Sequence, residues 1–209
     1  MSQELTKRIL SSIILIPITL FFIIKGSFLF IFFLLICLSV TSYEWHMMSK
    51  KKIYRLFGFI FLFLSFYTIY RLRIDNDYLF ILLITIICVS TDIGGYVFGK
   101  FFKGPKLTKF SPNKTYAGMI GGFLLSIISV IIFNNFYFVK DIQIKFFIFV
   151  ILISTISQLG DITVSYFKRL SKIKDTGKII PGHGGLLDRV DGMIFAFPLS
   201  YLILLTDVL

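Results

Sequence analysis

The sequence has few cysteines and no cysteine motif. Its two cysteines, Cys37 and Cys88, both fall inside apolar runs, and no CxxC pair occurs among the 209 residues. Disulfide frameworks and zinc sites need cysteines that are paired or closely spaced. Both are therefore excluded, and the two thiols are interpreted as small apolar packing residues.

Long polar segments are also missing. The longest ones span only about 16 to 23 residues, and each is bounded by apolar runs, which leaves no linker between soluble domains. Hydrophobic residues make up 56% of the chain and the mean hydropathy is +0.88, above the values of a soluble domain. We expect one membrane domain overall, with cytoplasmic loops at residues 99–116 and 168–189.

Seven apolar runs are long enough to cross a hydrocarbon core of about 30 Å. They are roughly Leu10 to Ile24, Phe28 to Trp45, Leu56 to Tyr70, Tyr78 to Phe98, Ala117 to Phe138, Phe146 to Phe167 and Val190 to Leu205. No small-x-small cleavage site follows the first run, so it is interpreted as a retained helix and not as a secretory signal. The sequence predicts an all-α integral membrane protein of about seven transmembrane helices in one bundle.

Acidic residues are scarce, and the formal net charge is +11. If the amino terminus is cytoplasmic, 17 of the 22 basic residues fall in cytoplasmic segments. The opposite side holds Lys25, Arg71, Arg73, Lys140 and Lys145. This alternation follows the positive-inside rule, so topology and anionic phosphates explain the charge and nucleic acid is excluded as a partner.

Four aspartates lie near the predicted cytoplasmic boundary of the apolar runs. Asp92 and Asp161 lie about 10 to 12 Å inside the lysines that end their runs, and Asp188 and Asp191 share a helical face by their i, i+3 spacing. An ionised group at such depth costs several kcal/mol unless it is paired, hydrated or metal-bound. We expect the four carboxylates to converge in a functional site, with structural pairing to Lys or Arg as the alternative.

The sixth run carries polar residues at helical spacing. They are Ser154, Gln158, Asp161, Ser165, Lys168 and Lys172, which predict one polar stripe on an otherwise apolar helix. The stripe is expected to face the bundle interior or a water-filled cavity. Its hydroxyl and amide groups are also explained by helix association, whereas its lysines indicate anions.

The loop between the fourth and fifth runs is rich in lysine. It combines five lysines with Ser111, Asn113 and Thr115, and lysine ammoniums and amides at a helix start both attract phosphate. A plain helix boundary with topogenic lysines explains the same residues. The small-xxx-small pair Gly118 and Gly122 is interpreted as a close helix contact.

The segment KDTGKIIPGHGGLLDRVDG, residues 174–192, combines glycines, a histidine and two aspartates. Its glycines allow the backbone to approach a ligand and to present amides to phosphate. Magnesium prefers hard oxygen ligands and binds through one or two carboxylates plus substrate phosphates. The segment therefore predicts metal-assisted phosphate chemistry, with His183 as a hydrogen-bonding residue or a proton carrier.

Several short motifs together carry a resemblance. They are Ser165-x-x-Lys168-Arg169, Lys174-Asp175-x-Gly177, Pro181-x-His183-Gly184-Gly185 and Asp188-Arg189-x-Asp191. This pattern resembles the signature of the phosphatidate cytidylyltransferase family, the CDP-diacylglycerol synthases. A second block is also similar to that family, namely Ser90-Thr91-Asp92-x-Gly94, Gly99, Ser111-Pro112-x-Lys114-Thr115 and Gly118. Tyr43-Glu44-Trp45 is a weaker match, so the resemblance is firm from about residue 90 to 192.

The resemblance implies an enzyme that converts phosphatidic acid and CTP into CDP-diacylglycerol and pyrophosphate with Mg²⁺. We expect residues 1–75 to form amino-terminal transmembrane helices and residues 76–209 the catalytic transmembrane region, in a bacterial cytoplasmic (inner) membrane. The distribution of basic residues predicts that the amino terminus and the active site face the cytoplasm. Membrane lipids are further partners, and a monovalent cation such as K⁺ and a homodimer are left open.

The implied roles divide by residue type. Asp161 and Asp188 would hold metal, and Asp92 and Asp191 would complete or support the site. The basic residues that would position phosphates are Lys168, Arg169, Lys174 and Arg189. Asp175 and His183 complete the expected catalytic set. The nucleotide or its phosphates would be held by Ser111, Lys114, Thr115, Gly184 and Gly185.

Three other functions fit parts of the pattern. A CDP-alcohol phosphotransferase also uses acidic pairs at a membrane surface, but it needs a D-G-x-x-A-R run and two further aspartates that do not follow Asp191. A transporter or channel explains the buried acids but not the segment 174–192. A non-catalytic lipid-binding relative is the third, although every position of the signature is filled.

Overall fold

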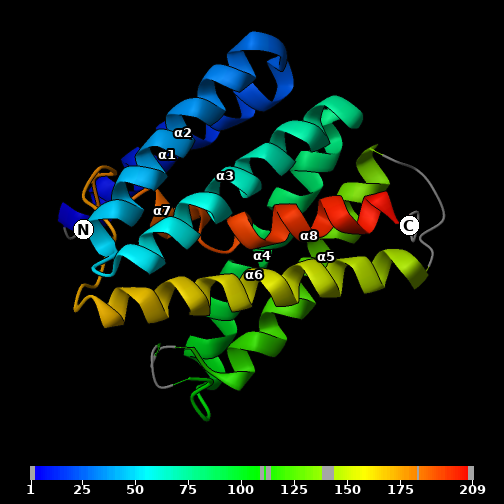
Figure 1. Cartoon of the computed structure of the whole chain (residues 1–209). Helices are drawn as coiled ribbons and strands as arrows, with labels where there is room; N and C mark the ends of the chain where they lie inside the picture. Colours follow the sequence, from blue (N-terminus) through cyan, green and yellow to red (C-terminus); the bar gives the residue numbers. More distant parts are fainter. Residues whose placement is uncertain (1–2, 109–110, 112–113, 138–143, 183, 207–209) are drawn as a thin grey trace. The chain divides into compact units, whose positions relative to one another are not determined.

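The computed structural model of the chain describes residues 3–108, 111, 114–137, 144–182 and 184–206. Regular structure in these ranges is α-helical (Figure 1). The helices are α1 (Gln3–Lys25), α2 (Ser27–Met48), α3 (Lys52–Asp75), α4 (Tyr78–Phe102), α5 (Tyr116–Tyr137), α6 (Ile144–Leu170), α7 (Leu187–Val190) and α8 (Met193–Leu205). The prediction of an all-α protein is confirmed for this part of the chain.

Five of the helices, α2 to α6, are long and apolar enough to cross a membrane, as judged by length and composition. The apolar part of α1, Leu10–Lys25, and the whole of α8 are shorter apolar helices. The last run was expected to start at Val190, but α8 starts at Met193, after a turn at Asp191 and Gly192. At about 1.5 Å per residue, the 13 residues of α8 rise only about 20 Å, which is less than a hydrocarbon core.

The chain divides into two compact units, and each is described by itself. The first unit contains Met1–Tyr78 and Phe167–Asp191, and the second contains Leu79–Tyr166 and Gly192–Leu209. The segment after α6 therefore packs with the amino-terminal helices, whereas the lysine-rich loop before α5 belongs to the second unit.

In the first unit, α1 and α2 pack side by side and are joined by a tight turn at Gly26 (blue in Figure 1). Gly26 has a φ of 64°, a conformation that favours glycine. The guanidinium of Arg73, from the end of α3, donates hydrogen bonds to the carbonyl groups of Ile23 (3.0 Å) and Ile24 (3.3 Å). Arg73 thus satisfies the last carbonyls of α1, which have no partner within their own helix.

In the second unit, glycines let α4 and α5 approach closely. A Cβ atom on Gly94 would overlap the carbonyl oxygen of Gly121, and one on Gly118 would lie 2.6 Å from the carbonyl oxygen of Gly95. A Cβ on Gly122 would lie 3.0 Å from the carbonyl oxygen of Thr91. The close helix contact predicted for Gly118 and Gly122 is confirmed.

Candidate functional site

The candidate site of the first unit begins where α6 ends. Lys172 has a φ of 58°, and the N–H of Ile173 donates to the carbonyl of Lys168 at 3.0 Å. The hydroxyl of Ser171 donates to the carbonyl of Met48 at the end of α2. This left-handed C-terminal turn ends the helix and starts the loop 171–186 against the amino-terminal helices.

Asp188, on α7 directly after that loop, is the centre of a polar cluster. Its Oδ1 accepts a hydrogen bond from Lys168 Nζ at 2.8 Å, and its Oδ2 accepts from the N–H groups of Thr176 (2.8 Å) and Gly185 (3.0 Å). Lys168 Nζ also lies 4.0 Å from Asp191 Oδ2. The side chains of Lys168, Asp188 and Asp191 are at most 10% exposed. We call these three residues the Lys168 cluster.

The charge of Asp188 follows from these contacts. Burial by itself raises the pKa of the carboxyl group, because it removes water from the charged form. The hydrogen bond and positive charge of Lys168 and the two backbone N–H donors outweigh burial, so the pKa lies below its ordinary value. Asp188 is therefore an ionised carboxylate at neutral pH, as a phosphate-positioning or metal-binding role requires.

Sequence reasoning missed Glu44 as a site residue. Glu44 lies on α2 and is 1% exposed. Its carboxylate accepts hydrogen bonds from the N–H groups of Leu186 (2.9 Å) and Leu187 (2.7 Å) and from Thr176 Oγ1 (3.2 Å). The signal was present in the sequence, because Glu44 is an acid inside an apolar run, the same feature that singled out the four aspartates.

The glycines of the loop make room for these carboxylates. A Cβ atom on Gly185 would overlap Thr176 Oγ1 and lie 2.6 Å from Glu44 Oε2, and one on Gly177 would lie 2.7 Å from Glu44 Oε1. Gly184 has a φ of 86°, and its N–H donates to the carbonyl of Ile180 at 3.2 Å. The N–H groups of Gly184 and Gly185 are thus already hydrogen-bonded within the unit, so phosphate binding by them stays a prediction that needs these bonds to open.

Four further predicted site residues, in the loop 171–186 and on the helices beside it, are exposed. Arg169, Lys174, Asp175 and Arg189 are exposed, and Arg169 Nη1 donates to the carbonyl of Ile173 at 3.1 Å. His183 lies outside the described residues, and its predicted role is neither supported nor opposed.

Asp161 is the corresponding acid of the second unit. It forms an ion pair with Lys114, and its Oδ1 accepts a hydrogen bond from Ser165 Oγ at 3.2 Å. The Asp161 and Lys114 side chains are 27% and 25% exposed, so this pair is more hydrated than the Lys168 cluster. In this structure both Asp161 and Asp188 are paired with a lysine, which is the structural alternative to a functional site.

The polar stripe of α6 faces the interior of the second unit along part of its length. Ser154 is fully buried, and its Oγ lies 2.7 Å from Thr91 Oγ1 of α4. A Cβ on Gly122 of α5 would lie 3.3 Å from Gln158 Nε2, so the amide packs against that helix. The interior orientation predicted for the stripe is confirmed for these two residues.

Thr115 and its described neighbours form hydrogen bonds at the start of α5. The N–H of Gly118 donates to Thr115 Oγ1 at 3.1 Å, which is the geometry of a helix N-cap. Backbone hydrogen bonds from Leu107 N–H to the carbonyl of Lys114 (2.8 Å) and from Lys114 N–H to the carbonyl of Ser111 (3.1 Å) shape the turn. Thr115 therefore has a structural role, and phosphate binding by Ser111, Lys114 and Thr115 stays a prediction.

The predicted convergence of four aspartates is met in part. Asp188 and Asp191 share Lys168, as their spacing predicts. Asp92 is exposed on α4, and Asp161 is paired with Lys114, both in the second unit. A common site for all four stays a prediction.

The donor chemistry of Asp161 and Asp188 fits magnesium. Among the residues described, no three His, Cys, Asp or Glu side chains gather in a way that suits a metal ion. A carboxylate offers about four lone-pair positions. Asp188 accepts three hydrogen bonds, and Asp161 has Lys114 and Ser165 as partners. Each carboxylate keeps acceptor capacity for a hard cation that takes its other ligands from phosphate and water.

Most of the chain is similar to known proteins. A family model described as the cytidylyltransferase family matches residues 51–206. A phosphatidate cytidylyltransferase of Rickettsia felis is 37% identical over 96% of this chain and 92% of its own length. That of Rickettsia typhi is 37% identical over 95% of this chain and 91% of its own length, and that of Staphylococcus saprophyticus is 33% identical over 82% and 68%. The match covers both the Lys168 cluster and the pair Lys114–Asp161, and the chain belongs to the cytidylyltransferase family.

Proposed function

We propose that this protein transfers a cytidylyl group from CTP to phosphatidic acid and forms CDP-diacylglycerol and pyrophosphate. The observation that carries the proposal is the family match over residues 51–206, together with relatives named phosphatidate cytidylyltransferase. The ionised Asp188, whose side chain is 6% exposed beside Lys168, and the nearby exposed cations on α6, the loop 171–186 and α7 supply the residue types that this chemistry needs.

The reaction is a single displacement at phosphorus. An oxygen of the lipid phosphate attacks the α-phosphorus of CTP and forms the new P–O bond. The bond between the α-phosphorus and the oxygen that bridges to the β-phosphate breaks, and pyrophosphate takes the electron pair. Positioning and charge neutralisation supply most of the catalysis in such transfers.

In the first unit, the Lys168 cluster holds an ammonium group between two carboxylates. This arrangement fixes the position of Lys168 Nζ on a rigid helix end, where it neutralises phosphate charge. Arg169 at the end of α6, Lys174 in the loop 171–186 and Arg189 on α7 are exposed, and they position the phosphates of the incoming nucleotide. Asp175 and His183 belong to the proposed site, with His183 as a proton carrier.

In the second unit, Lys114 and Asp161 provide a hydrated charge pair. Phosphate binding gives Lys114 a second anionic partner, and Ser111 and Thr115 add hydroxyl groups in the same loop. Asp92, on α4 of this unit, supports the site.

Mg²⁺ is part of the proposal, with Asp161 and Asp188 as its protein ligands. When bound, the ion supplies charge neutralisation at the phosphate oxygens. Both residues keep acceptor capacity for it, as described above, and a monovalent cation such as K⁺ is left open.

We further propose seven membrane crossings in a bacterial inner membrane, with the amino terminus and the active site on the cytoplasmic side. The five long helices supply five crossings, and Leu10–Lys25 and α8 supply the other two. Short helices are accommodated by local thinning of the bilayer at modest cost. The distribution of the basic residues supports the orientation.

The test compares Asp161→Asn and Asp188→Asn with the matched control Asp77→Asn. Asp77 is an exposed aspartate between α3 and α4, outside the proposed site. Purified wild-type protein is assayed with CTP, Mg²⁺ and phosphatidic acid for lipid product and pyrophosphate. We expect Asp161→Asn and Asp188→Asn to reduce turnover by at least about 100-fold, as removal of a group that stabilises transition-state charge does.

The control is expected to keep wild-type activity. Normal turnover in both site variants would contradict the metal assignment. Wild-type protein that inserts into membranes but releases no pyrophosphate with CTP and phosphatidic acid would contradict the proposed function.

A further inference from the structure

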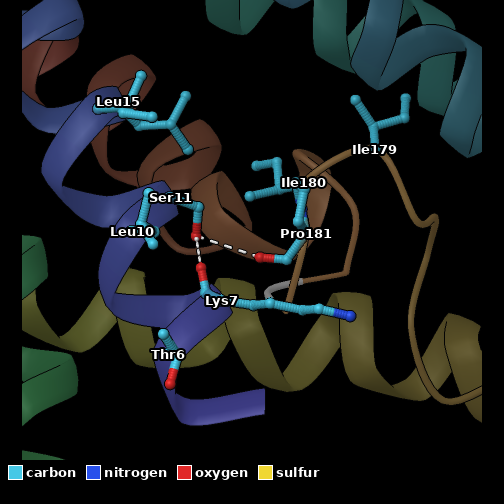
Figure 2. Close-up of a pocket in the computed structure, with 9 residues that line it drawn as sticks. Thr6, Lys7, Leu10, Ser11, Leu15, Ile179, Ile180 and Pro181 are labelled. Atoms are coloured by element: carbon cyan, nitrogen blue, oxygen red, sulfur yellow. Dashed lines mark hydrogen bonds between the residues drawn. The ribbon is translucent and has the colours of Figure 1, made fainter. Parts of the chain in front are cut away.

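A groove lies in the first unit between α1 and the loop 171–186, away from the contacts of the Lys168 cluster (Figure 2). Its volume is about 690 Å³. One wall is the amino-terminal half of α1, and the other is the loop segment at residues 179–181. Figure 2 shows the two walls joined near Pro181, where the hydroxyl of Ser11 donates to the Pro181 carbonyl at 3.2 Å.

The groove is apolar along most of its lining and basic at one end. Its apolar lining residues are Leu10, Ile14, Leu15, Ile179, Ile180 and Pro181. The charged residue of the lining is Lys7, which lies at the amino-terminal end of the α1 wall and is exposed. In Figure 2 the Lys7 side chain extends from α1 across the groove, past Pro181. An occupant that complements these walls has a hydrocarbon part and an anionic head.

The dimensions of the groove match one leaflet of a membrane. From Lys7 to Leu15, α1 rises about 12 Å, close to half of a hydrocarbon core of about 30 Å. Lys7 precedes the apolar part of the helix, Leu10–Lys25, so the ammonium is at the level of lipid headgroups when that part is in the membrane. A membrane lipid in normal orientation would match both the apolar length and the charged end of the groove.

The loop wall of the groove is connected to the Lys168 cluster by hydrogen bonds. Ile180 N–H donates to the carbonyl of Gly184 at 2.9 Å, and Gly184 N–H donates back to Ile180 at 3.2 Å. The next residue, Gly185, donates its N–H to Asp188. Hydrogen bonds thus link the segment that lines the groove to the segment that holds Asp188.

We propose that this groove binds phosphatidic acid, with one acyl chain along Leu10, Ile14 and Leu15 and the phosphate at Lys7. The inference rests on the proposed function, which makes phosphatidic acid the lipid substrate. The phosphomonoester head carries more than one negative charge near neutral pH, which favours it at a lysine over a phosphodiester lipid. A second exposed lysine, Lys178, directly precedes the loop wall.

Binding is tested without catalysis by photolabelling. Full-length protein in detergent micelles is incubated, without CTP, with phosphatidic acid that carries a photoreactive diazirine in one acyl chain. After irradiation, labelled peptides are identified by mass spectrometry. We expect label on residues 10–15 and 179–181, and we expect unlabelled phosphatidic acid to compete better than phosphatidylglycerol.

A pair of adjacent substitutions tests the apolar part of the groove. Ile14 lines the groove, and Ile13 does not line it and is 64% exposed. Ile14→Trp fills the groove and is expected to reduce labelling and to raise the KM for phosphatidic acid about tenfold, the equivalent of ~1.4 kcal/mol. Ile13→Trp adds the same indole to the same helix and is expected to change neither, and the KM for CTP stays constant in both variants.

A second pair tests the charge. Lys7→Gln is expected to raise the KM for phosphatidic acid and to remove its advantage over phosphatidylglycerol as competitor, whereas Lys25→Gln, at the other end of α1, is expected to change neither. Label that is absent from both walls overturns the proposal, and so do equal effects of Ile14→Trp and Ile13→Trp. Equal competition by phosphatidylglycerol overturns the assignment to phosphatidic acid.

The outcomes separate this inference from the proposed function. Labelling of the groove in a protein that makes no CDP-diacylglycerol leaves the groove standing and refutes the function. Normal CTP-dependent turnover without labelling of the groove leaves the function standing and refutes the groove.

Discussion

Glu44 shows how one residue of the amino-terminal helices organises a distant loop. Its buried carboxylate accepts two backbone N–H groups at the start of α7 and a hydroxyl from Thr176. Hydrogen bonds to a charged acceptor are worth more than neutral ones, and buried donors that lose their acceptor are costly. Glu44 is therefore a positioning residue for the segment that carries Asp188.

We predict that Glu44→Gln weakens this arrangement. The amide keeps one acceptor oxygen and turns an NH₂ donor toward backbone N–H donors, which is expected to cost about 2 kcal/mol of stability. Thermal unfolding in detergent measures the loss, and limited proteolysis reports opening of the loop 171–186. A positioning role further predicts a lower kcat at temperatures where the variant remains folded.

Thr176→Ser is the matched control for Glu44→Gln, because it keeps the hydroxyl donor to Glu44. It is expected to retain wild-type stability and kcat. A Glu44→Gln variant with unchanged kcat and unchanged proteolysis would show that the loop is held by other contacts.

At the scale of elements, the contact between α4 and α5 depends on which glycine faces the neighbour. Gly94 is buried against the backbone of Gly121, whereas a Cβ on the adjacent Gly95 would have Gly118 O as its nearest neighbour, at 3.8 Å. At Gly94 there is no space for a methyl group. At Gly95 a methyl group would lie at an ordinary van der Waals distance from its nearest neighbour. The two positions therefore respond in opposite ways to the same substitution.

We predict that Gly94→Ala destabilises the protein and that Gly95→Ala does not. Alanine in place of a helical glycine gains about 0.5 to 1 kcal/mol, but overpacking costs typically about 1 to 3 kcal/mol, so the loss prevails at Gly94. At Gly95 the gain is unopposed. Melting temperatures of the two variants in detergent measure the difference, and a Gly94→Ala variant as stable as Gly95→Ala would contradict the close contact.

The positions of helices follow from apolar runs, and their ends follow from local contacts. The first six expected runs are helical where the structure describes them, and the seventh is helical except at Asp191 and Gly192. The start of α5 is explained by the Thr115 cap, which only the structure shows. The predicted start of the last helix, Val190, is three residues before the observed start of α8 at Met193. The hydropathy of the run gives no sign of the turn at Asp191 and Gly192.

At the scale of the whole molecule, the distribution of basic residues predicts which loops face the cytoplasm. Lys50 lies in the α2–α3 connection and Asp77 in the α3–α4 connection, and both are exposed. The positive-inside rule places the first in the cytoplasm and the second outside.

We predict opposite labelling of these two connections. Cys37 and Cys88 are first replaced by alanine, and then Lys50→Cys or Asp77→Cys is introduced. A membrane-impermeant maleimide added to spheroplasts is expected to label the Asp77→Cys variant at once and the Lys50→Cys variant only after the membrane is permeabilised. The reverse pattern would invert the proposed topology.

By itself, the sequence determined the helical class, the apolar runs and the candidate acids, because hydropathy and charge are properties of residues in order along the chain. It also carried the family resemblance, which the comparisons confirm. Only the tertiary structure decided the partners: Lys168 for Asp188, Lys114 for Asp161, and Glu44 for the loop 142 residues farther along the chain. The groove between α1 and the loop 171–186 could not be predicted from the sequence either. Such contacts depend on which surfaces pack together, and that is settled by the shapes and hydrogen-bonding needs of many residues at once, not by the spacing of a few.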